Sequence, residues 1–197
     1  MAEKILMKQL IENYNRDGYV HLKNYLSGVL DLNTVASVGL DMRNRAHEYS
    51  KWKGISCASK HSTVLEEFYT SVTMRTLAKK FLGDDCYYFN DQIVYKLPHE
   101  TDFVFKAHYD NQYGPNIDNK IHTVNFCVIL DDFEVPLQVK CRDEWISLHP
   151  DKGDIIAIRG DTYHRSSGNT TDKPRGLYAC VYTKEPIYLD GFYSKKL

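Results

Sequence analysis

The chain has 197 residues, of which 43% are hydrophobic and 26% charged, and its formal net charge is -1. This length suits one domain with a sizeable core, so we expect a single domain over residues 1–197. The near-neutral charge gives no electrostatic case for nucleic acid or an anionic membrane as a partner. The longest apolar runs fall short of the about 18 residues that a membrane span needs, and none follows the first residues as in a signal peptide.

The cysteines indicate the redox setting. There are five of them, an odd number, widely spaced and without a CxxC pair. This pattern argues against a disulfide framework or a thiolate zinc site, and it favours a reducing, cytoplasmic location.

The front of the chain, about residues 1–83, has helical patterns. Apolar residues at helical spacing predict a first helix that ends before Asp17, and residues 20–26 form a candidate strand. Helical periodicity returns over residues 30–49. Thr63 and Glu66 predict a capping box that opens a helix to about Phe81, with Gly83 as its stop.

From about residue 84 to 185 the sequence changes to short β-prone runs separated by turn clusters. Many short strands at such spacing are typical of a barrel or a double-sheet jelly roll. We therefore expect a mainly β fold, with a helical N-terminal part packed against a β core. The runs cover residues 86–97, 103–105, 124–130, 145–148, 154–158 and 177–183.

Three side chains in the β region have the chemistry of a metal site. His108 and Asp110 form an HxD triplet after a short apolar run, and residues two apart in an extended segment point to the same side. His164 follows the strand predicted at 154–158. Two imidazoles and one carboxylate form the facial triad of non-haem Fe(II) enzymes, which leaves coordination positions open.

An HxD triplet also arises by chance, and the chain has a second one at residues 149–151. That copy precedes a Lys-Gly turn, and Pro150 limits pairing in a sheet, so we interpret it as a surface turn. The first triplet is distinguished by Arg175, which follows His164 by 11 residues and opens the last strong strand. A guanidinium suits a carboxylate because its planar fork donates two parallel hydrogen bonds.

Together these segments resemble the phytanoyl-CoA dioxygenase family of Fe(II)/2-oxoglutarate oxygenases. The resemblance spans about residues 17–184 and rests on four motifs. They are the Asp-Gly-Tyr-Val opening at 17–20, the HxD at 108–110, the Gly-Asp and apolar strand from 153, and the ending formed by His164, Ser166, Asn169 and Arg175.

The resemblance implies a double-stranded β-helix (jelly roll, cupin-like) fold flanked by helices. It implies that His108, Asp110 and His164 bind Fe(II), and that 2-oxoglutarate and O2 are co-substrates with ascorbate as a supporting reductant. It also implies that Arg175 binds the far carboxylate of 2-oxoglutarate with help from Ser166 and Lys96. The expected reaction hydroxylates a C–H bond and releases succinate and CO2, and the presence of Asp110 favours hydroxylation over halogenation.

The substrate is less well indicated. Lys106 and Ala107 stand where the family often has an aromatic residue, and the segment from Asp132 to Gly153 lacks the usual signatures of the family. We expect a small-molecule substrate, because the chain is short. Loops carry binding residues more often than strands do, which makes Asn111, Gln112, Tyr113 and Arg159 the candidates. The sequence does not indicate an oligomeric state.

Two rival functions are compatible with parts of this pattern. A cupin-like metal-binding protein or isomerase has a similar β framework without 2-oxoglutarate, and it predicts no role for Arg175. A non-enzymatic β-sandwich interaction module predicts no metal.

Overall fold

The computed structural model describes residues 2–26, 28, 30–51, 53–111, 122–189, 192–193 and 195–197. Within these residues, no helix combines the length and apolar composition that crossing a membrane requires. The helices are α1 (Ala2–Asp17), α2 (Leu32–Asn44), α3 (Thr63–Tyr69) and α4 (Val72–Leu82), with 3-10 turns η1 (Ala46–Glu48) and η2 (Ala58–His61).

The caps of the third and fourth helices differ from the sequence prediction. Ser62, not Thr63, caps α3, because its hydroxyl accepts the backbone N–H three residues on. The predicted helix to about Phe81 is broken near Ser71, whose hydroxyl caps α4 in the same way. Gly83 ends α4 as predicted, with φ +94°, a conformation that glycine adopts without steric cost.

The strands form two main antiparallel sheets. The large sheet has the order β1 (Tyr19–Leu22), β8 (Ile155–Arg159), β5 (Thr123–Ile129), β10 (Arg175–Thr183), β3 (Tyr87–Lys96) and β13 (Lys195–Lys196), and β2 (Ile55–Ser56) also pairs with β3. The small sheet has the order β4 (Phe105–His108), β9 (His164–Ser166), β6 (Leu137–Cys141) and β7 (Glu144–Leu148). A separate pair joins β11 (Tyr188–Leu189) to β12 (Phe192–Tyr193).

The chain alternates between the two sheets. It passes from β3 in the large sheet to β4 in the small sheet, returns to β5, continues to β6 and β7, returns to β8, and ends the core with β9 and β10. This alternation between two antiparallel sheets defines a jelly roll of the double-stranded β-helix type, which confirms the predicted fold class. Strands β6 and β9 were not predicted.

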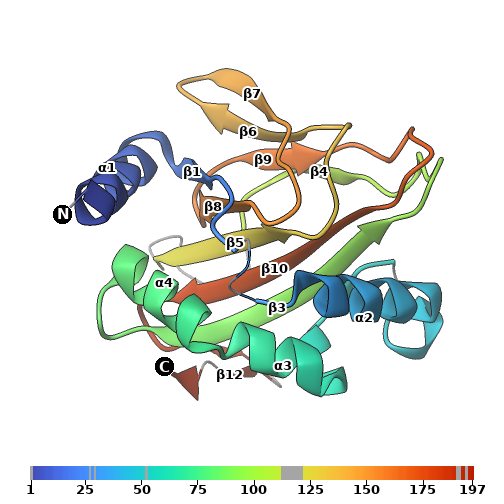
Figure 1. Ribbon diagram of the computed structural model, residues 1–197, viewed down its shortest axis with the longest axis horizontal. Helices are drawn as coiled ribbons and strands as arrows, with labels where there is room; N and C mark the ends of the chain where they lie inside the picture. Colours follow the sequence, from blue (N-terminus) through green and yellow to red (C-terminus); the bar gives the residue numbers. More distant parts are fainter. Residues whose placement is uncertain are drawn as a thin grey trace.

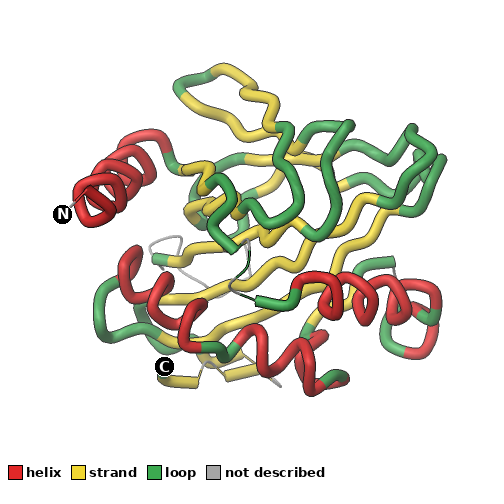
Figure 2. The backbone as a smooth tube through the Cα atoms, in the orientation of Figure 1, coloured by secondary structure: helices red, strands yellow, loops and turns green. Residues whose placement is uncertain are grey.

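Helices α2, α3 and α4 lie on one face of the large sheet and the small sheet lies on the other (Figure 1). Figure 2 shows α2, α3 and α4 along one face, while α1 lies beyond the edge formed by β1. One buried apolar cluster joins these helices to the large sheet, and a smaller cluster fills part of the space between the two sheets. The helical front therefore covers one face and leaves the interior between the sheets for a site.

Strand alternation decides which side chains reach that interior. On β5, Val124 and Phe126 belong to the helix-facing cluster, whereas Cys127 and Ile129 belong to the cluster between the sheets. Since side chains alternate along a strand, Asn125 shares the inner face with Cys127. By the same alternation, Lys96 on β3 and Arg175 on β10 face inward. Together with Asn125 and Cys127 they line one pocket.

Candidate active site

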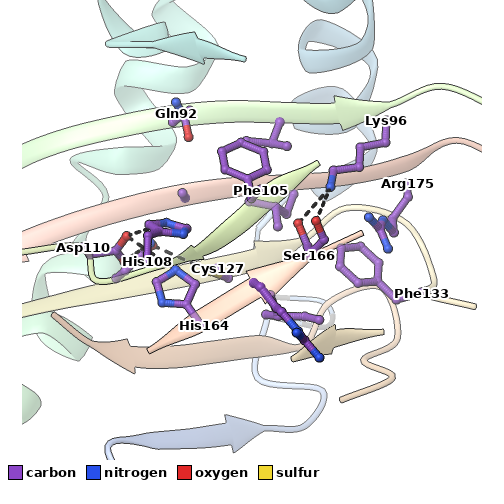
Figure 3. A pocket seen from close by; sticks show the side chains of 16 residues that line it. Gln92, Lys96, Phe105, His108, Asp110, Cys127, Phe133, His164, Ser166 and Arg175 are labelled. Carbon is purple, nitrogen blue, oxygen red and sulfur yellow. Dashed lines mark hydrogen bonds and ion pairs between the residues drawn. The ribbon is translucent and has the colours of Figure 1, made fainter. Parts of the chain in front are cut away.

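His108, Asp110 and His164 come together at one end of the pocket between the sheets (Figure 3). Strands β4 and β9 pair with His108 directly opposite His164, and Asp110 follows two residues after β4. One ligand atom from each residue lies within 4.8 Å of the others. The structure therefore brings together the three side chains that the sequence singled out.

Both histidine rings are oriented by backbone carbonyls. His108 Nδ1 lies 2.8 Å from the Lys106 carbonyl oxygen, and His164 Nδ1 lies 2.9 Å from that of Thr162. A carbonyl only accepts, so Nδ1 carries the proton in each ring and the Nε2 lone pair of the neutral ring is free. This second hydrogen bond is the usual support of a metal-binding histidine.

Asp110 presents one oxygen to both rings. Its Oδ1 lies 3.5 Å from His108 Nε2 and 3.5 Å from His164 Nε2, while its Oδ2 accepts from Asn125 Nδ2 at 2.8 Å. Burial alone would raise the pKa of Asp110, but the charge of His164 and the hydrogen bonds outweigh it and lower the pKa. Asp110 is the first cause of a raised pKa at His108. The carboxylate is thus ionised at neutral pH and faces two nitrogen donors.

This donor set fits a divalent metal ion. Two imidazole nitrogens and one carboxylate oxygen are the ligands of a 2-His-1-carboxylate site, which suits iron and leaves positions for other ligands. Asp110 Oδ1 lies 3.5 Å from each Nε2, and the three ligand atoms lie within 4.8 Å of one another, so one ion can contact all three. The residues present fit Fe(II).

The second feature of the pocket is the Lys96 ammonium. Lys96 is only 2% exposed, and its Nζ donates to Ser166 Oγ at 2.8 Å and to the carbonyl oxygens of Ser166 and Ser167 at 3.2 and 2.6 Å. Burial, together with the charge of Arg175, lowers the pKa of Lys96 to about 7. Figure 3 shows Lys96 and Ser166 joined by these hydrogen bonds.

Arg175 lies beside this lysine at the same end of the pocket (Figure 3). It is 4% exposed, and burial lowers its pKa to about 10. Its guanidinium donates to the carbonyl oxygens of Val135 and Ser167, at 2.8 and 2.5 Å, and lies over the Phe133 ring. Arg175 and Lys96 thus share the Ser167 carbonyl, which links the two cations.

Neither of these buried cations has a carboxylate within ion-pair distance among the residues that the structure describes. A buried charge without a counterion is costly, so a carboxylate ligand between the pocket walls would be strongly favoured. Both the metal-ligand residues and the two cations line this pocket between the sheets. It connects the cluster of His108, Asp110 and His164 to the two buried cations.

The remaining predicted residues have different positions. Asn111 is buried, and its backbone N–H donates to the Gly160 carbonyl, which ties the segment after Asp110 to the turn after β8. Gln112 and Tyr113 lie outside the described residues. The second HxD lies in the turn between β7 and β8, as predicted.

Arg159 is not brought to the pocket. Side chains alternate along a strand, so Arg159 lies on the same face of β8 as Ile155 and Ala157. Those two residues face the helices, and the Arg159 side chain therefore lies on the outer face. There it donates to the Asn15 carbonyl of α1 at 2.8 Å and to Asp161 at 2.5 Å. Contrary to the expectation from the sequence, Arg159 therefore does not line the pocket between the sheets.

Some pocket residues were missed from the sequence. Asn125 contacts Asp110, and Phe105 and Phe133 lie beside the two cations. An amide within the apolar run 124–130 was a signal for Asn125, because a polar side chain on a buried strand needs a partner. The phenylalanines carry no such signal, since apolar residues on strands are expected in any core.

Comparisons with solved structures give the same fold. The non-heme alpha ketoglutarate dependent epimerase SnoN from nogalamycin biosynthesis matches with a TM-score of 0.79 and 18% identity over 93% of this chain and 85% of that chain. The carbocyclase SnoK matches with 0.78 and 16% over 91% and 84%. EctD from S. alaskensis, with 2-oxoglutarate and 5-hydroxyectoine, matches with 0.74 and 16% over 89% and 75%.

These likenesses show the double-stranded β-helix fold, and the neighbours are iron- and 2-oxoglutarate-dependent enzymes by their names or bound groups. No protein-family model and no curated protein sequence matches the chain. Membership of the phytanoyl-CoA dioxygenase family therefore stays a prediction.

Proposed function

We propose that this protein is an Fe(II)- and 2-oxoglutarate-dependent oxygenase that hydroxylates a C–H bond of a small molecule and releases succinate and CO2. The observation that carries the proposal is the pairing, in one pocket, of a 2-His-1-carboxylate cluster with two buried cations that lack a carboxylate partner among the described residues. A metal-binding protein without 2-oxoglutarate explains the first feature and leaves the second unexplained.

In this proposal His108 and His164 bind Fe(II) through Nε2 and Asp110 binds it through Oδ1. Arg175 and Lys96, with the Ser166 hydroxyl, bind the far carboxylate of 2-oxoglutarate. When bound, the metal with 2-oxoglutarate and O2 supplies the oxidising chemistry, and the protein contributes ligands, orientation and a dry pocket. SnoN was solved with Fe3+ and alpha ketoglutarate, and EctD with 2-oxoglutarate, which supports the same co-substrate here.

In this proposal the apolar lining of the pocket strengthens the binding of the carboxylate. Val94, Leu137, Leu177 and Ala179 contribute apolar side chains to the lining of the same pocket. Such a lining excludes water, which strengthens the attraction between the cations and a bound carboxylate. A carboxylate near Lys96 favours its ammonium form, so binding is expected to raise the pKa of Lys96 from about 7.

Hydroxylation is the outcome we propose among those known for this fold. SnoN is named an epimerase and SnoK a carbocyclase, whereas EctD was solved with 5-hydroxyectoine. Asp110 occupies the carboxylate position of the metal cluster, and its presence favours hydroxylation over halogenation.

The test is succinate formation from 2-oxoglutarate with Fe(II), O2 and ascorbate. We expect slow uncoupled turnover by the wild-type protein, none by His108→Ala, and a marked loss in Arg175→Met. Arg142→Met is the matched control, because the Arg142 side chain is 73% exposed and does not line the pocket. Turnover by His108→Ala equal to that of the wild type would refute the metal assignment, and full turnover by Arg175→Met would refute the receptor.

A further inference from the structure

Asn125 contacts the carboxylate of the metal cluster from the inner face of β5. It is 7% exposed, and its Nδ2 donates to Asp110 Oδ2 at 2.8 Å. The other oxygen, Oδ1, is the one that lies 3.5 Å from both histidine Nε2 atoms. The two oxygens of Asp110 therefore have separate partners: an amide on one side and the metal position on the other.

Cys127 fixes the orientation of the Asn125 amide. It lies two residues further along the inner face of β5, and its Sγ–H donates to Asn125 Oδ1 at 3.8 Å. Burial raises the pKa of the Cys127 thiol, so the thiol keeps its proton at neutral pH. With Oδ1 occupied by this donor, the Nδ2 of the amide points at Asp110, which only accepts when ionised.

Asn125 and Cys127 both lie on β5, a buried strand in the interior of the large sheet. β5 lies between β8 and β10 in the large sheet and is hydrogen-bonded along both edges. Every residue of β5 is buried. Groups on such a strand are positioned more firmly than groups on loops.

We propose that Asn125, held by Cys127, is a positioning residue that keeps Asp110 a one-oxygen metal ligand. The inference rests on the proposed function, since it assumes that the cluster binds a metal ion. A free carboxylate can bind a cation through both oxygens. The hydrogen bond to Oδ2 makes that second contact unfavourable and so preserves the open positions that the co-substrates need.

The experiment measures Co(II) binding to the purified protein, by titration and by the d–d absorption bands of the bound ion. The main variant is Asn125→Leu, which keeps the branched shape of the side chain and removes the donor, and Asn125→Ala is the second. We expect Co(II) affinity to fall about 10- to 100-fold, as for other partners that orient metal ligands, with altered band positions and intensities. The thermal midpoint of the metal-free protein is measured alongside.

Two further sets of variants separate positioning from packing. Thr123→Val is the control, because Thr123 lies on the same face of β5, is 1% exposed, and has a hydroxyl without a hydrogen-bond partner among the described residues. It should bind Co(II) like the wild type. Cys127→Ser keeps a donor for Asn125 and should retain the wild-type spectrum, whereas Cys127→Ala should shift it in the direction of the Asn125 variants.

Each outcome has a defined meaning. Wild-type Co(II) affinity and spectrum in Asn125→Leu or Asn125→Ala would overturn the positioning role while leaving the proposed function intact. Equal spectra in Cys127→Ser and Cys127→Ala would overturn the part assigned to Cys127, and they also decide the case if both Asn125 variants fail to fold. A wild-type protein that binds no Co(II) would overturn the proposed function and this inference with it.

Discussion

Replacing Lys96 with methionine tests whether the buried Lys96 ammonium lowers the stability of the free protein and serves to bind a carboxylate ligand. Lys96 is 2% exposed, and burial lowers its pKa from 10.5 to about 7. This change corresponds to about 5 kcal/mol against the ammonium form in the folded protein. Methionine has a similar length and no charge, so Lys96→Met removes that cost.

The pH dependence of this destabilisation follows from the lowered pKa of Lys96. Between pH 7 and 10.5 the unfolded chain binds a proton at this lysine that the folded protein does not, so the destabilisation is full below pH 7 and is lost as pH rises toward 10.5. The variant also leaves the acceptors on Ser166 without their donor, which offsets part of the gain. We expect a net stabilisation of about 1–3 kcal/mol at pH 6.5, which is about 2–10 °C in the thermal midpoint.

The assay is thermal unfolding of the metal-free protein from pH 6.5 to 10, with and without 2-oxoglutarate. Lys96→Met should unfold at a higher temperature than the wild type at pH 6.5, and the difference should shrink as pH rises. Added 2-oxoglutarate should stabilise the variant less than the wild type. Lys80→Met, at an exposed position on α4, is the control. The reasoning fails if Lys96→Met is no more stable at pH 6.5 and responds equally to 2-oxoglutarate.

Three further predictions concern other parts of the molecule. Arg175→Met should weaken 2-oxoglutarate binding by about 2–5 kcal/mol in calorimetry while leaving Co(II) affinity unchanged, because the guanidinium contacts no metal ligand. Co(II) affinity should fall as pH drops from 8 to 5.5, because Asp110 raises the pKa of His108 and protons then compete with the metal at higher pH; a pH-independent affinity would contradict this. Ser62→Ala should lower the thermal midpoint by about 2–4 °C through loss of the α3 cap, about 1 kcal/mol, and should leave metal binding intact.

The metal cluster was predictable because its ligands follow a simple local rule. His108 and Asp110 are two residues apart in an extended segment, so their side chains point to the same side whatever the tertiary fold. Their distance to His164 is set by pairing between β4 and β9. β9 has only three residues and was not predicted. The sequence therefore indicated His164 as a ligand but not the strand that positions it.

The parts that were missed depend on which face of a strand is inward. β5 is buried on both faces, so the alternation of Thr123 and Asn125 with apolar residues does not by itself tell which face lines the pocket. Arg159 was assigned to the pocket from its place in a turn, whereas the parity of β8 directs it toward α1. The break between α3 and α4 was missed because Ser71 stands within a continuous helical pattern, where its role as a cap shows only in the structure.

The most direct test of the central claim is the visible spectrum of the protein with Fe(II) and 2-oxoglutarate under anaerobic conditions. Chelation of the metal by the 2-oxo acid group produces a charge-transfer band that neither component gives alone. We predict this band for the wild type, its absence in Asp110→Ala and His164→Ala, and its appearance only at higher 2-oxoglutarate concentration in Arg175→Met. A wild-type protein that binds Fe(II) and gives no band at saturating 2-oxoglutarate would contradict the proposed function.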